Sequence, residues 1–152
     1  MGVYITTSKN SSQKTKTLCE ALSSVLPSST HERRGNKSIE QIFMRAKLLG
    51  KSRVMFVYEK AEIPSKICLM KVKAHSWEWI GRELSVSNYQ IHKIPSELPA
   101  ELMFTGERSG EFEKLFDFEA PEGDEFIELN CEREKLSFTY GDKPLIELEL
   151  VS

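Results

Sequence analysis

Two short apolar stretches decide the fold: VYITT at residues 3–7 and VMFVY at residues 54–58. Both are rich in β-branched or aromatic residues, and the second is apolar at five consecutive positions, which is typical of a strand covered on both faces. Two helical patterns lie between them. Because a strand that returns to its sheet after a helix does so by a right-handed crossover, we expect the two stretches to be neighbouring parallel strands.

The two intervening helices have recognisable starts. Asn10, Ser11 or Ser12 is expected to be the N-cap of the first helix, because a short polar side chain there can accept a hydrogen bond from a free backbone N–H group. Pro27 ends this helix, and Ser38 is expected to cap the second. The apolar positions recur at helical spacing in both helices: Leu18, Leu22, Val25 and Leu26, then Ile39, Ile42, Phe43, Ala46 and Leu49.

The remainder of the chain reads mostly as strands. The pattern predicts strands over 67–72 and within 84–91, and a further strand over 102–105 followed by a helix over roughly 109–118, which repeats the opening strand–helix order. Three alternating runs then indicate an antiparallel meander with one solvent-exposed, acidic face; they cover 127–131, 136–140 and 146–150.

The fold class expected from these patterns is α/β, with two pseudo-repeated α/β halves and a C-terminal antiparallel meander. The 152 residues suffice for one ordinary domain. We therefore expect a single domain over 1–152, with an N-terminal half of about 1–90 and a C-terminal half of about 91–152.

Composition and motifs narrow the classes of function that the chain can have. With 39% hydrophobic and 29% charged residues the chain is globular. No secretory signal and no apolar run of about 20 residues is visible, so neither export nor a membrane partner is expected. Three separated cysteines fit a reducing cytoplasm. Isolated histidines and the absence of glycine-rich phosphate loops predict no metal, no cofactor, no small-molecule substrate and no enzymatic activity.

The charges are divided along the chain. Residues 1–53 carry ten Lys or Arg against three Glu, a net charge of +7, whereas residues 96–152 carry five basic and sixteen acidic residues, a net charge of −11. Such a division favours a polyanion partner at the basic end, and solubility or a basic partner at the acidic end.

Two polar, basic segments could form the site: TTSKNSSQKTK at residues 6–16 and HERRGNKS at residues 31–38. Each precedes or opens a helix, where hydroxyl groups, ammonium groups and free backbone N–H groups suit phosphate oxygens. The first also follows the first strand, at the sheet edge where α/β proteins usually bind ligands.

The same residues resemble a known family. TSKNSSQKTK at residues 7–16 and RRGNKSIE at residues 33–40 resemble the opening of the Brix domain, whose pattern is Thr-Ser-Arg-x-Pro-Ser-x-Arg-x-Arg followed by Arg-x-Arg-Gly-x-x-Ser-Leu-Glu-Glu. The resemblance is specific over about residues 4–60, and the length suits the minimal single-domain form typical of archaea. Lysines replace three arginines of the pattern, which keeps the charge but loses the bidentate guanidinium.

This resemblance implies a non-enzymatic ribosome biogenesis factor that binds ribosomal RNA or its precursor, with ribosomal proteins or other assembly factors as further partners. It also implies two halves that each resemble the anticodon-binding domain of class II aminoacyl-tRNA synthetases. The lysines would meet phosphates, the hydroxyl groups would be hydrogen-bonding neighbours, and the second segment would extend the basic surface. The implied RNA-binding residues are Thr7, Ser8, Lys9, Ser12, Lys14, Lys16, Arg33, Arg34 and Lys37.

Other interpretations stay open. The acidic C-terminal third could dock a basic ribosomal protein, or the chain could be a stand-alone tRNA-binding domain. Both alternatives depend on whether segments 6–16 and 31–38 form one continuous positive surface. Trp77 and Trp79 share one strand face by alternation, which predicts core residues, with a base-stacking pair as the alternative.

Overall fold

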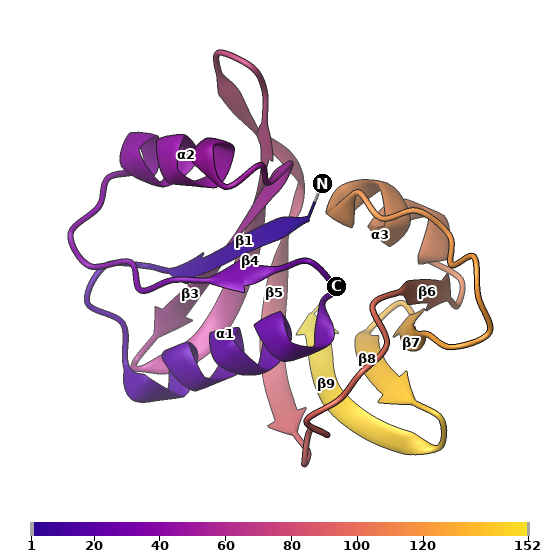
Figure 1. The fold of residues 1–152 in the computed structure, drawn as a ribbon. Coiled ribbons are helices and arrows are strands. Elements are labelled where there is room, and N and C mark those ends of the chain that lie inside the picture. Colours follow the sequence, from indigo (N-terminus) through magenta and orange to yellow (C-terminus); the bar gives the residue numbers. More distant parts are fainter. Residues whose placement is uncertain (1, 152) are drawn as a thin grey trace.

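The computed structural model describes residues 2–151, which form one mixed sheet of nine strands with three helices (Figure 1). In chain order the elements are β1 (Val3–Thr7), α1 (Gln13–Val25), β2 (Thr30–His31), α2 (Ile39–Leu48), β3 (Arg53–Lys60), β4 (Ile63–Val72), β5 (Trp77–Ile91), β6 (Leu102–Thr105), α3 (Ser109–Phe116), β7 (Ile127–Cys131), β8 (Lys135–Tyr140) and β9 (Lys143–Val151).

The expected parallel pair is confirmed. The sheet order is β2-β1-β3-β4-β5-β9-β8-β7-β6, and β1 pairs in parallel with β3 from Val3 opposite Arg53 to Thr7 opposite Val57. β1 also pairs in parallel with β2 on its other edge. A strand paired on both edges and covered on both faces is fully buried, which is why all five residues of β1 are apolar or threonine.

Most of the sheet is antiparallel, so the α/β fold class expected from the parallel pair of strands describes only part of it. Only β2–β1–β3 and β6–β7 run parallel, while β3-β4-β5-β9-β8-β7 is a continuous antiparallel series. The alternation noted at 84–91 belongs to a strand of 15 residues. Irregular pairing between Ile67 and Leu69, and between Val86 and Asn88, interrupts the side-chain alternation, so the whole strand is hard to recognise in sequence.

Helices cover both faces of the sheet. The core on one face contains apolar residues of α1 and α3, and the core on the other contains those of α2 against β1, β3 and β4. Figure 1 shows α1 and α2 on opposite sides of the sheet. Within residues 2–151, no helix combines the length and hydropathy that crossing a bilayer requires.

The start of α1 is held by a carboxylate from a distant strand. Ser12 is the N-cap, as expected, and its side chain accepts from the Thr15 backbone N–H group. Glu59, near the end of β3, accepts from the backbone N–H of Ser12 at 3.0 and 3.1 Å, from its hydroxyl at 2.7 Å, and from the Thr15 hydroxyl at 2.5 Å. Burial opposes the charge of Glu59, but the hydrogen bonds from Thr15 and Ser12 outweigh it and lower its pKa.

Replacing Glu59 with Gln should therefore lower the free energy of unfolding by about 1–2 kcal/mol at pH 7, because these hydrogen bonds lose their charge assistance. A lowered carboxyl pKa contributes stability above its unfolded value of about 4.3 and loses it as the pH falls through the folded value. The difference between the two proteins should thus shrink in acid. Urea unfolding at pH 7 and at pH 3 measures both effects.

Glu62→Gln is the matched control, because Glu62 lies three positions away with an exposed side chain. It removes the same charge from the side chain and leaves in place the Glu62 backbone carbonyl, which accepts from the Ser12 hydroxyl at 2.9 Å. An equal loss of stability in the two variants, or a loss in Glu59→Gln that does not change with pH, would contradict the role given to Glu59.

Candidate nucleic-acid interface

The two basic segments lie side by side. Segment 6–16 follows β1 and segment 31–38 begins in β2, and since these strands are parallel neighbours, their C-terminal ends share one edge of the sheet. The Thr6 hydroxyl donates to the Glu32 carbonyl at 2.9 Å, and the Glu32 backbone N–H donates to the Ile5 carbonyl at 3.2 Å. In Figure 1 both connections project from the same end of the sheet.

Arg34 joins the two segments from inside. Its side chain is 7% exposed. Nη1 donates to the Thr7 carbonyl at 2.9 Å and Nε donates to the Lys37 carbonyl at 2.7 Å, while the guanidinium lies 5.6 Å from the centre of the Phe56 ring. Of the residues singled out in sequence, Arg34 is therefore the one whose cation is committed to the fold. Its neighbour Arg33 is exposed.

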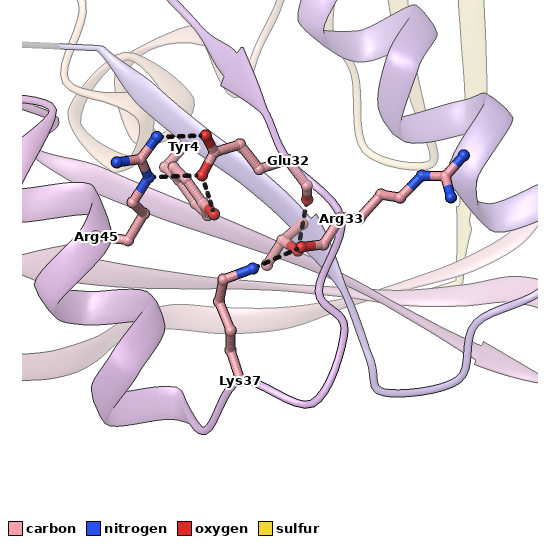
Figure 2. A network of polar contacts seen from close by, with 6 residues as sticks. Tyr4, Glu32, Arg33, Lys37 and Arg45 are labelled. Atoms are coloured by element: carbon pink, nitrogen blue, oxygen red, sulfur yellow. Dashed lines mark hydrogen bonds and ion pairs between the residues drawn. The ribbon is translucent and has the colours of Figure 1, made fainter.

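A second network of polar contacts is centred on Glu32 of segment 31–38 (Figure 2). Arg45 of α2 donates two hydrogen bonds to the Glu32 carboxylate, at 2.8 and 2.7 Å, and the Tyr4 hydroxyl donates a third at 2.8 Å. The hydrogen bond from Arg45, against the opposing effect of burial, helps to lower the pKa of Glu32 to about 2. Burial and the contact with Glu32 raise the pKa of Tyr4. Sequence reasoning missed this network, because its hydrogen-bonded pairs are 28 and 13 positions apart in the chain.

Several predicted cations stay available. Lys9, Lys14 and Arg33 are exposed and Lys16 is partly exposed. In the part of the chain that the structure describes, none of these four side chains has a hydrogen bond or ion pair. Lys37 donates to the Arg33 carbonyl at 3.2 Å, and Figure 2 shows the Arg33 guanidinium pointing away from the Glu32 network.

The predicted hydroxyl groups differ in role. Thr7 is 2% exposed and its hydroxyl contacts the Ser8 carbonyl and the Ser11 hydroxyl, each at 2.8 Å. Ser12 is occupied by the helix cap and Glu59. Ser8 is partly exposed. Among the three, Ser8 is the one whose side-chain oxygen has no protein partner within residues 2–151.

The helix N-termini have part of their N–H groups occupied by partners within the protein. At α1 the Glu59 carboxylate already receives the Ser12 backbone N–H group. At α2 a capping box is complete: Ser38 Oγ accepts from the Gln41 backbone at 3.2 Å, and Gln41 Oε1 accepts from the Ser38 backbone at 2.8 Å. The caps therefore reduce what the helix ends offer to an anion, and the side chains of the two segments supply the charge.

Among residues 2–151, no three His, Cys, Asp or Glu side chains are grouped so as to hold a metal ion. The arrangement that the two segments do offer is a set of adjacent, flexible cations at one sheet edge. Such a set can neutralise several phosphates of a polyanion.

No family model matches the chain. A probable Brix domain-containing ribosomal biogenesis protein of Thermococcus kodakarensis is 31% identical over 107 residues, which are 64% of this chain and 50% of that protein. A protein of the same description from Pyrococcus horikoshii is 30% identical over 79 residues, 52% of this chain and 35% of that protein. The matches thus span half or less of these curated relatives.

Solved structures share the fold over nearly the whole chain. A probable ribosomal biogenesis protein from Aeropyrum pernix superposes with a TM-score of 0.85 at 22% identity, covering 98% of this chain and 94% of that one. Mil, an archaeal Imp4-like protein, superposes with a TM-score of 0.73 at 17% identity, covering 98% and 97%. The resemblance of this chain to the Brix domain family, first indicated by the motifs at residues 7–16 and 33–40, is therefore confirmed.

Proposed function

We propose that this chain is a non-enzymatic ribosome biogenesis factor that binds ribosomal RNA or its precursor through segments 6–16 and 31–38. The observation that supports this function best is that the two basic segments, 15 residues apart in sequence, adjoin at one sheet edge through hydrogen bonds from Thr6 and Arg34. The names of the curated relatives point to the same process.

The charge balance at this edge favours RNA. Lys9, Lys14, Lys16, Arg33 and Lys37 supply the positive charge. Two acids at this edge have internal partners: Glu32 is paired with Arg45, and the ionised Glu59 accepts hydrogen bonds from the N-cap of α1. Lysines on flexible stems contact phosphates as point charges, so the interface reads the RNA backbone more than its bases.

The implied RNA-binding set separates into two roles. The exposed lysines and Arg33 would meet phosphates, whereas the buried Arg34 would hold the two segments in place. Thr7 and Ser12 would likewise shape the surface, because their hydroxyl groups have internal partners. This separation leaves the proposed interface intact but changes what each mutation should do.

We also infer that the two halves are structural repeats within one domain. β1 and β3 are a parallel pair followed by the meander β3-β4-β5, and β6 and β7 are a parallel pair followed by the meander β7-β8-β9. The halves meet where β5 pairs with β9. The likeness to anticodon-binding domains and the tRNA-binding alternative that follows from it stay predictions.

The protein-docking alternative uses the other end of the chain. Part of the acidic charge there has internal partners, since Glu147 contacts Lys135 at 2.7 Å and His92 at 2.8 Å. Glu132, Glu134 and Glu149 remain exposed. A basic ribosomal protein that binds this face could act beside the RNA interface. Titration of RNA against variants of the basic segments separates RNA binding from protein docking.

Changing Lys14 and Lys16 together to Ala should weaken RNA binding for all sequences alike. Each lost phosphate contact should flatten the slope of log affinity against log salt by roughly one unit, because fewer counterions are released. Titration of a ribosomal RNA fragment at several salt concentrations measures affinity and slope. Circular dichroism should show intact protein, since Lys14 is exposed and Lys16 partly exposed.

The matched control is the double variant Lys114→Ala with Lys143→Ala, which removes two exposed lysines from the C-terminal half. Its RNA affinity and salt slope should equal those of the wild type. If both double variants bind like the wild type, or if the control weakens binding as much, the basic segments are not the interface. Capture of a basic ribosomal protein would then favour the docking alternative.

Arg33 and Arg34 should give opposite results although they are adjacent. Arg33→Ala should lower RNA affinity and leave the free energy of unfolding unchanged. Arg34→Ala should lower the free energy of unfolding by about 1–3 kcal/mol, because the carbonyl groups of Thr7 and Lys37 lose a charged donor in a buried setting. Urea unfolding and RNA titration of both proteins measure the contrast.

Arg34→Lys keeps the charge but replaces the planar fork with one ammonium group, so it should be destabilised as well. An Arg34→Lys protein as stable as the wild type would contradict the bridging role. Equal stability losses in the Arg33 and Arg34 alanine variants would contradict it too.

A further inference from the structure

An aromatic cluster lies on the α2 side of the sheet, next to segment 31–38. It consists of Phe56 and Tyr58 of β3 and Trp77 and Trp79 of β5, which alternate along their strands and so share one face. The ring centres of Phe56 and Trp79 are 5.4 Å apart, those of the two tryptophans 5.3 Å, and those of Phe56 and Tyr58 6.1 Å. The expectation that both tryptophans are core residues is wrong for Trp79, which is 45% exposed.

Trp79 is both exposed and fixed. Its ring meets Phe56 at an interplanar angle of 63° and Trp77 at 77°, so two edge-to-face contacts define its orientation. Trp77 is itself anchored, because its indole N–H donates to the Glu40 carboxylate of α2 at 2.9 Å. A large aromatic surface held in one orientation loses little conformational entropy when a flat ligand stacks on it.

A pocket opens beside Trp79. Its volume is about 340 Å³, and its lining includes Tyr58, Lys66, Cys68, Trp79, Gly81 and Arg82. This volume is at the lower end of the range for small-ligand sites, about 300–1,000 Å³, so the pocket suits one planar group and not a bulky element. Gly81, at the floor of this lining, has a positive φ of 66°, and a Cβ there would come within 2.7 Å of the Leu115 side chain of α3, so glycine is required by the packing behind the pocket.

The rim of the pocket is positively charged. Lys66 Nζ lies 5.1 Å from the centre of the Tyr58 ring, and Arg82 is exposed. Glu83 is the acid in the lining; its Oε1 is 3.5 Å from Lys66 Nζ, with 65% of its side chain exposed. Within the lining, two cations face one solvated carboxylate, and Arg82 also interacts with Glu111 of α3; the positive charge of the rim is therefore carried mainly by Lys66 and Arg82 and is complementary to a phosphate.

The pocket is linked to the proposed interface through the buried side chain of Phe56. The Arg34 guanidinium, which bridges segments 6–16 and 31–38, also lies over the ring of Phe56, and Phe56 contacts both Tyr58 and Trp79. Glu59, the residue after Tyr58, accepts hydrogen bonds from Ser12, which lies in segment 6–16 and is the N-cap of α1. Tyr58 thus lies between Phe56, which contacts Arg34, and Glu59, which contacts the N-cap of α1, so the aromatic face begins beside the basic segments.

We propose that Trp79 and Tyr58 form a stacking site for an unpaired base of single-stranded RNA, with Lys66 and Arg82 contacting the phosphates on either side. This inference rests on the proposed RNA-binding function and names the form of RNA that the site takes. A base within a duplex is stacked on both faces and cannot enter a pocket, whereas an unpaired base can stack on an aromatic side chain. Lysine and arginine at the rim add affinity without sequence preference.

The experiment compares two RNAs with the full chain: an unstructured 12-nucleotide uridine-rich strand and a blunt duplex hairpin. Trp79→Ala should weaken binding of the single strand about 5- to 10-fold, within the range for one lost stacking contact. Binding of the duplex should change less than twofold, and the salt slope should stay that of the wild type, because no phosphate contact is removed. Trp79→Phe should restore most of the affinity, since it keeps an aromatic face.

Leu48→Ala is the matched control, because Leu48 of α2 is also a large apolar residue and is 77% exposed. It should bind both RNAs like the wild type. In a Trp77→Phe background Trp79 is the sole tryptophan, and its fluorescence should be quenched by the single strand and not by the duplex. Thermal unfolding of each variant separates a loss of stacking from a loss of fold.

The outcomes are distinct. A Trp79→Ala protein that binds the single strand like the wild type, or loses both RNAs equally, overturns the stacking site. If, at the same time, the Lys14 and Lys16 double variant still loses affinity, the proposed RNA-binding function is supported without the stacking site. If the wild type binds neither RNA, both proposals fall.

Discussion

The parallel pairing of β1 with β2 and β3 is the constraint on which the geometry of the candidate site depends. Parallel strands end at the same edge, so the connections that follow β1 and β2 and the end of β3 converge there. This convergence lets Arg34 reach the Thr7 carbonyl, and it lets Glu59 of β3 reach the start of α1. An antiparallel β1 would send segment 6–16 to the opposite edge and separate it from segment 31–38.

The same edge shows how internal contacts select which charges remain for a ligand. Glu32 and Glu59 would cancel nearby cations if they were free, but each accepts several hydrogen bonds from the protein. Those contacts lower their pKa values against the effect of burial, with smaller contributions from Lys37 at Glu32 and from Lys16 at Glu59, so both stay ionised. Arg45 is the cationic partner of Glu32, Arg34 donates to backbone carbonyl groups, and the lysines of segment 6–16 extend toward solvent.

Local signals predicted the features that depend on local chemistry. The caps Ser12 and Ser38, the parallel pair and the final meander all follow from side-chain periodicity and capping, and the structure confirms them. Contacts between distant residues could not be read in the same way. Nothing in the sequence distinguishes Arg33 from Arg34, because the difference is whether the side chain points between β1 and α2 or away from them.

The exposure of Trp79 has the same kind of cause. Alternation correctly puts both tryptophans on one face of β5, but how far α2 extends over that face is a tertiary property. The pairing of β9 with β5 begins only at Ser85, so the first half of β5 pairs with β4 alone; there α2 contacts Trp77 through Glu40 and leaves Trp79 exposed. A pattern of apolar residues therefore predicts a face, while the helix packed on it decides which residues are buried.

The division of charge along the chain also contributes to the contact between its halves. Arg53, at the start of β3, donates from Nε to the Leu115 carbonyl at 3.0 Å and from Nη2 to the Lys114 carbonyl at 3.3 Å. These carbonyl groups belong to the last turn of α3, where backbone acceptors have no helical partner and the helix dipole favours a cation. The basic N-terminal half thus caps a helix of the acidic half. Because β5 and β9 already join the halves by strand pairing, this second contact fixes α3 against the sheet and limits rotation between them.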